Sequence, residues 1–248
     1  MIEKTSKKPF YGFTALPVTI IGLTIILILT IIIFFFSFLL GLILFCFLAY
    51  AIFSCAVSMY LVNPTKSIDY SKILKLDGDE LVLDVGCGLG RATIGLAKQL
   101  KTGKIIGVDV WDNLEIPGNS AEKAYKNAEI ENVRDRVEFR FGDTFDLAFD
   151  NEYFDAVICS GLLTSFHNDK QKLLALKEIR RVLKNNGTFL MREPILHLKT
   201  FIVLTPPILF YVRLPTRKHW AELLKLSKFK IIRYHPHRIA GSFETIKI

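Results

Sequence analysis

The 248-residue sequence has no aspartate, glutamate, lysine or arginine in a run of 57 residues, from Pro9 to Thr65. Elsewhere charge is plentiful, with 23% charged residues over the whole chain and a formal net charge of +8. Intrinsic disorder is excluded, because disordered chains have low hydrophobicity and 51% of these residues are hydrophobic. The composition therefore indicates an apolar segment joined to residues 63–248, which are enough for one domain with a single core.

Cysteine is scarce, and its placement excludes two further classes of protein. Cys46 and Cys55 lie in the apolar run, whereas Cys87 and Cys159 are far apart in the remainder. There is no C-x-x-C pair and no Cys/His cluster with ligand spacing, so we predict neither a disulfide scaffold nor a structural zinc site. We expect all four to be small apolar side chains in a protein of a reducing compartment, without a metal.

The apolar run predicts a transmembrane hairpin. Residues 15–62 are too long for the apolar core of a signal peptide, which has about 7–15 residues. They are also more than twice the roughly 20 residues that one span needs. We predict two spans, at Leu16–Phe36 and residues 39–61, with the turn within residues 37–41. The alternative is a buried helical hairpin in the core of a soluble protein.

The charges on either side of this hairpin predict its orientation. The basic residues nearest to it are Lys4, Lys7 and Lys8 before it and Lys66, Lys72 and Lys75 after it. Basic residues near the ends of spans favour the cytoplasmic side, and two spans keep both clusters there. We therefore expect a two-span membrane protein, with a basic arm (residues 1–14) and a domain (residues 63–248) that face the cytoplasm.

Beyond Pro64, short apolar runs alternate with amphipathic segments. The expected strands are Leu81–Val85, 104–110, Val137–Phe141, 154–159 and 188–192; the expected helices are 91–100, 120–130 and 169–183, followed by a turn at 184–187. This alternation predicts β-α-β units and a parallel sheet. After a helix that begins at Pro215, residues 229–234 and 242–248 predict an antiparallel hairpin at the sheet edge. Together these elements form a Rossmann-like, doubly wound α/β fold with a mostly parallel seven-stranded sheet.

A glycine-rich loop, DVGCGLG (residues 84–90), joins the first of these strands to a helix. Glycines let the backbone approach a ligand closely, and a helix N-terminus offers free N–H groups. The dinucleotide fingerprint G-x-G-x-x-G/A is not matched, because its sixth position is Arg91 or Thr93 when counted from Gly86 or Gly88. The phosphate-binding pattern G-x-x-x-x-G-K-[ST] is absent as well. The loop therefore favours another nucleotide-like ligand.

The pattern D-x-G-x-G-x-G and the acids spaced after it resemble the class I S-adenosylmethionine-dependent methyltransferases. Over about residues 76–229, the chain looks closest to the type 11, or ubiquinone-biosynthesis-like, branch. The stretch GNSAEKAYKNAEIENVRDRVEFRFGD and the N-terminal hairpin add to this likeness. The resemblance implies S-adenosylmethionine as the cofactor and a small molecule as the methyl acceptor.

The resemblance also implies roles for individual residues. Those that match the motif for the methionine part of the cofactor are Asp84, Gly86, Gly88 and Gly90. Asp109 matches the acid that binds both ribose hydroxyls, since a carboxylate can accept two hydrogen bonds from a diol. Asp143 matches the residue that contacts the adenine amino group, and Trp111 is expected to flank the adenine. Ser160 begins the segment that passes near the methionine and the substrate.

An aspartate after a strand is often only a helix cap or a turn former. Three acids, each at a predicted strand end, favour a ligand site instead, because ligands of open α/β sheets bind at the carboxyl ends of the strands. Methyl transfer itself mainly requires orientation and exclusion of water. A base is needed only where the acceptor loses a proton. His167 is the candidate base, with a solvated loop residue or a helix cap as its alternative. Glu193 is a second candidate, for which we favour a structural role.

Residues 195–214 form a second apolar stretch, interrupted by Pro206 and Pro207, and we predict an interfacial or lid segment rather than a third span. Residues 66–179 have 15 Lys/Arg against 20 Asp/Glu, whereas residues 180–248 have 14 against 3. A basic tail beside an apolar stretch indicates a face turned to anionic lipid and a lipophilic or membrane-delivered acceptor.

Nucleic-acid substrates are disfavoured, because the signature [ND]-P-P-[YF] is missing after residue 159. Two alternatives stay open: a membrane protein that binds the cofactor without transferring methyl groups, and a protein or nucleic-acid methyltransferase held at the membrane. The sequence predicts no particular oligomeric state.

Overall fold

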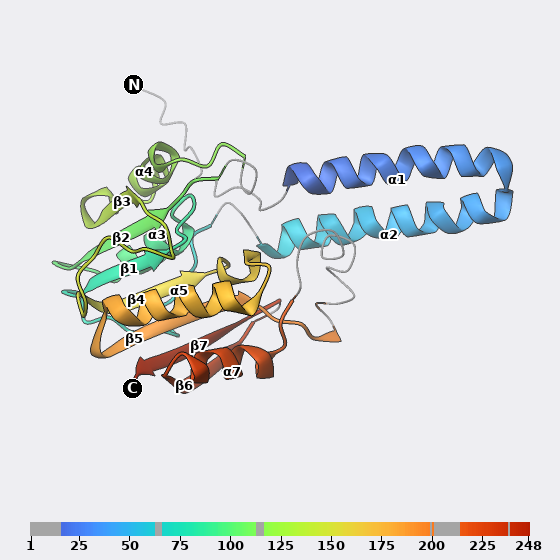
Figure 1. Ribbon diagram of the computed structural model, residues 1–248. Helices are drawn as coiled ribbons and strands as arrows, with labels where there is room; N and C mark the ends of the chain where they lie inside the picture. Colours follow the sequence, from blue (N-terminus) through green and yellow to red (C-terminus); the bar gives the residue numbers. More distant parts are fainter. Residues whose placement is uncertain (1–15, 63–65, 113–116, 199, 201–213, 238) are drawn as a thin grey trace, which may run out of the picture.

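The computed structural model describes residues 16–62, 66–112, 117–198, 200, 214–237 and 239–248. It consists of a pair of long antiparallel helices and an α/β domain (Figure 1). The predicted basic arm, residues 1–14, lies outside the described residues, as does most of the predicted apolar insertion at 195–214.

The predicted hairpin is formed by α1 (Leu16–Phe36) and α2 (Phe38–Val62). Its turn is tighter than the predicted 37–41, because Ser37 alone separates the two helices. Gly41 belongs to α2, and its role is steric. A Cβ at this position would lie 2.7 Å from the Cα of Phe34, so glycine allows α1 and α2 to approach each other beside the turn.

Both helices are long and apolar enough to cross a membrane. With 21 and 25 residues, and a rise of about 1.5 Å per residue, each matches the roughly 30 Å hydrocarbon core. Only 6% of the most apolar window of α1 (Thr19–Phe36) and 22% of that of α2 (Phe38–Val57) is buried. The described residues therefore leave most of this apolar surface uncovered.

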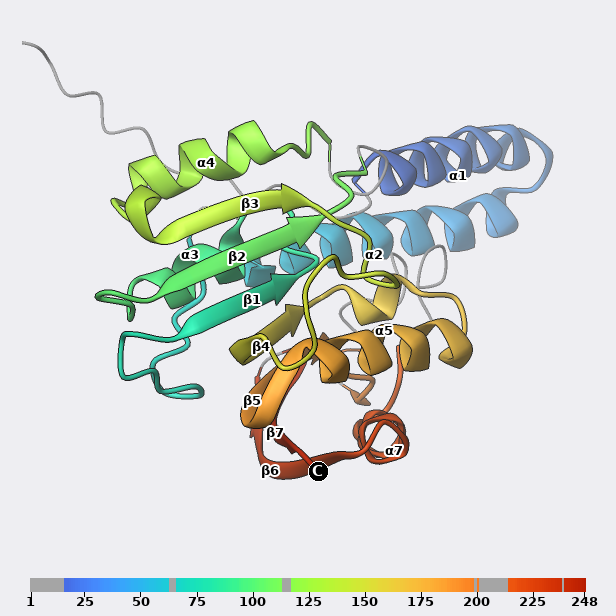
Figure 2. The ribbon, with the colours of Figure 1, turned by 60° about the vertical axis from the view of Figure 1, so that its left-hand side comes forward.

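The α/β domain is built on one seven-stranded sheet (Figure 2). The strands are β1 (Leu81–Val85), β2 (Lys104–Asp109), β3 (Val137–Phe141), β4 (Phe154–Ser160), β5 (Leu183–Pro194), β6 (Phe229–Pro236) and β7 (Ala240–Lys247), in the order β3-β2-β1-β4-β5-β7-β6. β7 runs antiparallel between β5 and β6, and the pairs β1–β2, β1–β4, β2–β3 and β4–β5 are parallel. The Rossmann-like fold and its antiparallel last strand are confirmed.

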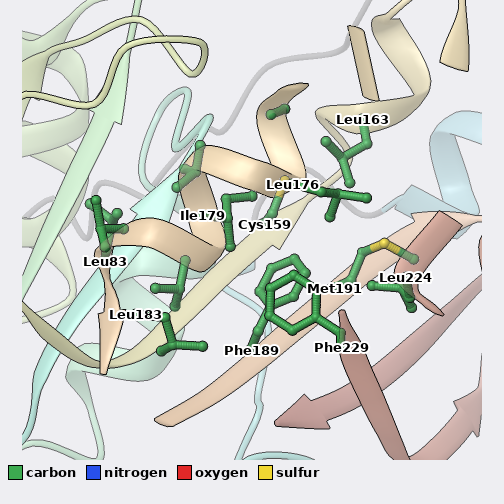
Figure 3. Close-up of a cluster of buried hydrophobic side chains, with 14 of the residues drawn as sticks. Leu83, Cys159, Leu163, Leu176, Ile179, Leu183, Phe189, Met191, Leu224 and Phe229 are labelled. Atoms are coloured by element: carbon green, nitrogen blue, oxygen red, sulfur yellow. The ribbon is translucent and has the colours of Figure 1, made fainter. Parts of the chain in front are cut away.

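Helices cover both faces of the sheet, and each face has its own apolar core. The helices are α3 (Arg91–Ala97), α4 (Ala121–Ile130), α5 (Asp169–Val182) and α7 (Arg217–Leu226), with short 3-10 turns η1 (Arg134–Arg136) and η2 (Leu163–Ser165). Leu176 of α5 and Leu224 of α7 pack with Phe189 of β5 on one face (Figure 3). On the other face, Ile94 of α3 and Ala124 of α4 pack with the fully buried Tyr70, which precedes β1.

One local prediction is wrong. Residues 184–187, predicted as a turn, belong to β5, which therefore begins five residues before the predicted start at 188. Phe154 of β4 pairs with Leu183 and Ala156 pairs with Thr188, so the residues between form a bulge in the ladder. Asn186 within it has a positive φ of 63°. The same residue types serve turns and bulges, and the pairing with β4 decides between the two.

The hairpin projects from one particular end of the domain. In both views the arrowheads of β1 and β2 point toward the end from which α1 and α2 extend (Figures 1 and 2). The apolar helices and the carboxyl ends of the parallel strands therefore lie on the same side of the molecule.

Candidate functional site

The glycine loop between β1 and α3 folds over the end of β2. The N–H groups of Gly86 and Cys87 donate to the carbonyl oxygen of Val108, at 2.9 and 3.1 Å. Gly86, Gly88 and Gly90 have φ angles of 75°, 51° and 81°. An L-residue pays roughly 1–2 kcal/mol in this left-handed region, so the loop conformation itself requires glycine.

Gly86 and Gly90 also meet close neighbours. A Cβ at Gly86 would lie 2.8 Å from the side chain of Leu162, in the segment after β4. A Cβ at Gly90 would lie 2.7 Å from the ring of Phe139, on β3. The loop therefore packs against the segment after β4 on one side and against β3 on the other, and these contacts fix the N-terminus of α3.

Asp109, at the end of β2, is tied to this loop. Its Oδ2 accepts a hydrogen bond from the N–H of Gly88 at 2.8 Å, and its Oδ1 accepts one from the N–H of Trp111 at 2.6 Å. The indole N–H of Trp111 in turn donates to the carbonyl oxygen of Gly88 at 3.1 Å. Burial raises the pKa of Asp109, and the backbone donors partly offset this. Three of the predicted site residues therefore form one connected group.

Asp84, on β1, is fully buried. Thr93 of α3 donates a hydrogen bond from its Oγ1 to Asp84 Oδ2 at 2.5 Å. Asp84 Oδ1 is buried and has no hydrogen-bond partner in the part of the chain that the structure describes. Burial raises the pKa of Asp84 to about 7, although the bonds to Thr93 work in the opposite direction. An orphaned buried carboxylate oxygen is uncommon in native proteins.

The loop after β3 brings the third predicted acid to the same edge. The N–H of Gly142 donates to the carbonyl oxygen of Asp109 at 3.1 Å, so Asp143 follows directly beside the end of β2. Asp143 is exposed, and its Oδ1 accepts a hydrogen bond from the N–H of Phe145 at 2.9 Å. This Asx turn fixes the start of the loop.

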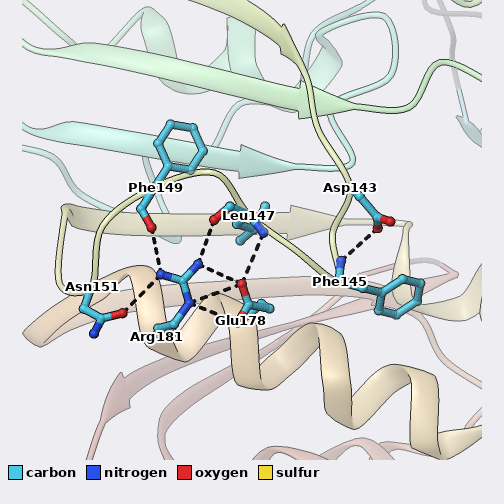
Figure 4. Close-up of polar contacts among 7 residues, drawn as sticks. All are labelled: Asp143, Phe145, Leu147, Phe149, Asn151, Glu178 and Arg181. Atoms are coloured by element: carbon cyan, nitrogen blue, oxygen red, sulfur yellow. Dashed lines mark hydrogen bonds and ion pairs between the residues drawn. The ribbon is translucent and has the colours of Figure 1, made fainter.

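Arg181 of α5 holds the rest of this loop (Figure 4). Its guanidinium donates to the carbonyl oxygens of Leu147 and Phe149, both at 2.7 Å, and to Asn151 Oδ1 at 3.1 Å. Glu178 forms an ion pair with Arg181 at 2.8 Å and accepts a hydrogen bond from the N–H of Leu147 at 3.2 Å. Residues 147–151 are thereby held against α5.

Ser160 ends β4 and contacts a residue from well outside the sheet. The Tyr70 hydroxyl donates to Ser160 Oγ at 3.3 Å. Burial raises the pKa of Tyr70 to about 12, so its hydroxyl keeps its proton at neutral pH. The segment that leads from α2 into the domain thus reaches the predicted site.

Glu193 has the structural role that the sequence favours. Its buried carboxylate accepts hydrogen bonds from the N–H of Leu163 at 3.0 Å and from the N–H and hydroxyl of Thr164 at 3.2 and 2.9 Å. Burial raises the pKa of Glu193 to about 7. These bonds anchor the start of η2 to β5.

His167 is exposed in the loop before α5. The N-cap of α5 is Asn168, whose side chain accepts a hydrogen bond from the N–H of Gln171 at 3.0 Å. His167 is therefore not the cap. Within the described ranges, no hydrogen bond joins it to Ser160 or to the glycine loop, and its role as a base stays a prediction.

The structure adds residues that the sequence argument missed. Tyr70 carries no local signal, because its partner lies 90 positions away. Thr93 had only the weak signal of a hydroxyl on the first turn of the helix after the glycine loop. Arg181 is one of many basic residues on an amphipathic helix, and nothing local sets it apart.

Known proteins resemble this chain over the part that contains the glycine loop and the strand ends. Residues 82–187 match a family described as "Methyltransferase domain". Over 119 residues the chain is 32% identical to demethylmenaquinone methyltransferase of Lactobacillus johnsonii, covering 48% of this chain and 45% of that protein. Over 81 residues it is 41% identical to erythromycin 3''-O-methyltransferase of Saccharopolyspora erythraea, covering 33% and 24%. The chain spans less than half the length of these curated relatives.

Solved structures share the fold of the α/β domain. An O-methyltransferase family 2 protein from Planctomyces limnophilus, in complex with apigenin, has a TM-score of 0.63 and 18% identity, covering 77% of this chain and 60% of that one. A SAM-dependent methyltransferase from Aquifex aeolicus has a TM-score of 0.57 and 17% identity, covering 73% and 90%. At these identities the likeness concerns the fold.

S-adenosylmethionine is the cofactor that this family and fold imply. The residues at the carboxyl ends of the strands fit it. Asp84 offers an unpaired carboxylate oxygen suited to a cationic group. Asp109 is fixed by backbone donors, and each of its oxygens keeps a lone pair for a hydroxyl. No cluster of three or more potential metal ligands occurs among the residues described.

Proposed function

We propose that this protein is a membrane-anchored, S-adenosylmethionine-dependent methyltransferase of the type 11, or ubiquinone-biosynthesis-like, branch. Its acceptor is a small, lipophilic or membrane-delivered molecule. The observation that carries the proposal is the common placement of two features: the cofactor edge of the methyltransferase domain and the apolar hairpin lie on the same side of the molecule (Figures 1 and 2).

The cofactor supplies a methyl group already activated by a positive sulfur, so the protein's task is to bind, orient and exclude water. Asp109 binds the ribose hydroxyls, held in place by Gly88 and Trp111. Asp143 receives the adenine amino group, with Trp111 beside the ring. Asp84 and the glycine loop would hold the methionine end, and Ser160 would begin the segment that passes near the methionine and the acceptor. His167 removes a proton where the acceptor is a hydroxyl or an amine.

Three observations support a membrane location. The hairpin exposes apolar side chains along its length, among them Phe35 and Phe36, at 84% and 87% exposure. Residues 180–248 have 14 Lys/Arg against 3 Asp/Glu, which suits anionic headgroups. Leu198, in the described part of the predicted insertion, is 74% exposed. In the proposed arrangement the methyltransferase domain faces the cytoplasm.

The test uses the full chain in native membranes, supplied with cofactor labelled in its methyl group. We expect label in the organic-extractable fraction. Asp109→Ala should abolish this labelling, and calorimetry should show that the variant binds the cofactor at least tenfold more weakly. Label confined to protein or RNA would contradict the lipophilic acceptor. Cofactor binding without any label transfer would contradict the transferase activity.

A further inference from the structure

A row of polar side chains crosses the carboxyl end of the sheet beyond the glycine loop. Ser160 of β4 pairs with Arg192 of β5, and Arg192 pairs with Ser242 of β7. Directly paired residues of neighbouring strands present their side chains on the same face. At one end of the row Tyr70 donates to Ser160 Oγ at 3.3 Å; at the other, His237 Nε2 lies 2.9 Å from Ser242 Oγ. We call these five residues the polar row.

The polar row interrupts an apolar surface. Two positions earlier on the same strands, Ile158 of β4 pairs with Leu190 of β5, and both are fully buried in the core below Tyr70. A change from packed aliphatic side chains to hydroxyls and a guanidinium at the carboxyl ends of these strands marks the place where ligands of open α/β sheets bind. Packing of the core alone does not require hydroxyls and a guanidinium at these strand ends.

Arg192 is the cation of this row, and among the described residues no acidic side chain pairs with it. The side chain is half-buried, and its Nε is buried without a hydrogen-bond partner. No ion pair joins it to a carboxylate anywhere in the described chain. Of the two acids closest in the ladder, Glu193 accepts hydrogen bonds from Leu163 and Thr164, and Glu244 lies 3.5 Å from the Nε2 of His235. Charges withdrawn from water are normally paired.

The chemistry of the row suits an anion. A guanidinium presents a planar fork of N–H donors that matches the two oxygens of a carboxylate or a phosphate. The hydroxyls of Ser160 and Ser242 flank it in the ladder. Burial, and then the charge of Arg192, lower the pKa of His237, so this histidine is neutral at pH 7 and Arg192 is the charged member.

We propose that Arg192 binds an acidic group, a carboxylate or a phosphate, on the methyl acceptor. This rests on the proposed transferase function and makes its acceptor more specific: an amphiphile with a lipophilic body and an anionic end. Ser160 belongs both to the segment predicted beside the methionine and to the polar row. The acidic group therefore docks one strand away from the methyl donor and sets the orientation of the acceptor.

The first experiment measures anion binding to the full chain in nanodiscs, saturated with S-adenosylhomocysteine. The probe is benzoate, titrated by calorimetry at constant ionic strength, with benzamide as its neutral counterpart. Wild type should bind benzoate more tightly than benzamide. Arg192→Gln should bind benzoate at least tenfold more weakly than wild type, and the affinity of Arg192→Lys should lie between the two. Arg233→Gln, an exposed arginine of β6, is the matched control and should behave as wild type. Equal benzoate affinity in wild type and Arg192→Gln, or no binding to either, overturns the proposal.

The second experiment distinguishes the acceptor from the cofactor, whose methionine end also bears a carboxylate. Wild type and Arg192→Gln are compared for binding of S-adenosylmethionine and of its decarboxylated form. We expect wild type and Arg192→Gln to show the same ratio of affinities for S-adenosylmethionine and its decarboxylated form. If Arg192→Gln abolishes that preference, Arg192 binds the cofactor and the acceptor assignment is wrong. In the label-transfer assay, Arg192→Gln should raise the concentration of lipid extract that gives half-maximal rate. An unchanged value there overturns this inference alone, whereas absence of transfer by wild type overturns the proposed function.

Discussion

Thr93 donates a hydrogen bond to one oxygen of the buried Asp84 carboxylate at 2.5 Å, and the other oxygen has no partner among the described residues. Only one of the two carboxylate oxygens therefore has a hydrogen-bond partner within the described residues. Its pKa, raised to about 7 by burial, places its change of charge within the physiological range.

Cofactor affinity should therefore depend on pH through Asp84. Below pH 7 the carboxyl is mostly protonated, and above pH 7 it is ionised and attracts the cationic methionine end. We expect affinity for S-adenosylmethionine to rise up to about tenfold from pH 6 to pH 8, because one pKa unit corresponds to a tenfold change in the protonation equilibrium. Calorimetry at each pH measures this, and Asp84→Asn is the control. A slope retained in Asp84→Asn would assign the titration to another group.

The same acid should make the ligand-free protein less stable as pH rises. A folded-state pKa raised above the unfolded value of about 3.9 means that the folded state binds more protons between those two values. The free energy of unfolding should therefore fall between about pH 4 and pH 7, and Asp84→Asn should remove this contribution. Urea titrations at several pH values, compared between the two proteins, measure the difference.

Two glycines with similar backbone angles provide a matched test of steric fit in the loop. Gly90 has φ 81° and Gly161 has φ 79°, so alanine pays a similar backbone cost of roughly 1–2 kcal/mol at each. Only Gly90 has atoms within 4 Å of an added Cβ, the closest at 2.7 Å on Phe139. Gly90→Ala should lower the melting temperature more than Gly161→Ala and should also weaken cofactor binding. Equal losses in both variants would show that the contact with Phe139 relaxes freely.

Arg181 is predicted to position Asp143 from a distance. Arg181→Ala removes the donors that hold residues 147–151, and each lost bond to a charged group costs about 1.5–3 kcal/mol. We expect faster hydrogen exchange in residues 143–151 and several-fold weaker cofactor binding. Arg180→Ala, which loses a bond to the terminal Ile248 carbonyl instead, is the control. Binding that is equally weak in both variants would indicate a general loss of stability.

The proposed topology is tested by labelling with a membrane-impermeant maleimide in intact cells. Ser37→Cys places a thiol at the exposed turn of the hairpin, and Ser71→Cys places one at an exposed position before β1. Ser37→Cys should react in intact cells, and Ser71→Cys only after permeabilisation, because in the proposed topology the basic flanks keep the domain on the cytoplasmic side. The wild-type protein, with its native cysteines, gives the background. The reverse pattern would invert the topology.

The parts of this fold that the sequence predicts are those specified locally. The apolar run Leu81–Val85 and the glycines after it define strand, loop and helix within a few residues, and Asp109 follows from strand alternation. Contacts across the chain leave no such pattern: Tyr70 and Ser160 are 90 positions apart, and Arg181 and Leu147 are 34 apart. The β5 bulge was not predicted for a related reason, since only the pairing with β4 distinguishes it from a turn.

The position of the hairpin at the carboxyl end of the sheet has a kinetic consequence (Figure 2). An acceptor dissolved in the bilayer would search for this protein by lateral diffusion within a thin layer, not through the volume of the cell. Its relevant concentration is then the number of molecules per unit of membrane area. Turnover should consequently respond to dilution of the membrane with inert lipid and be insensitive to dilution of the aqueous phase.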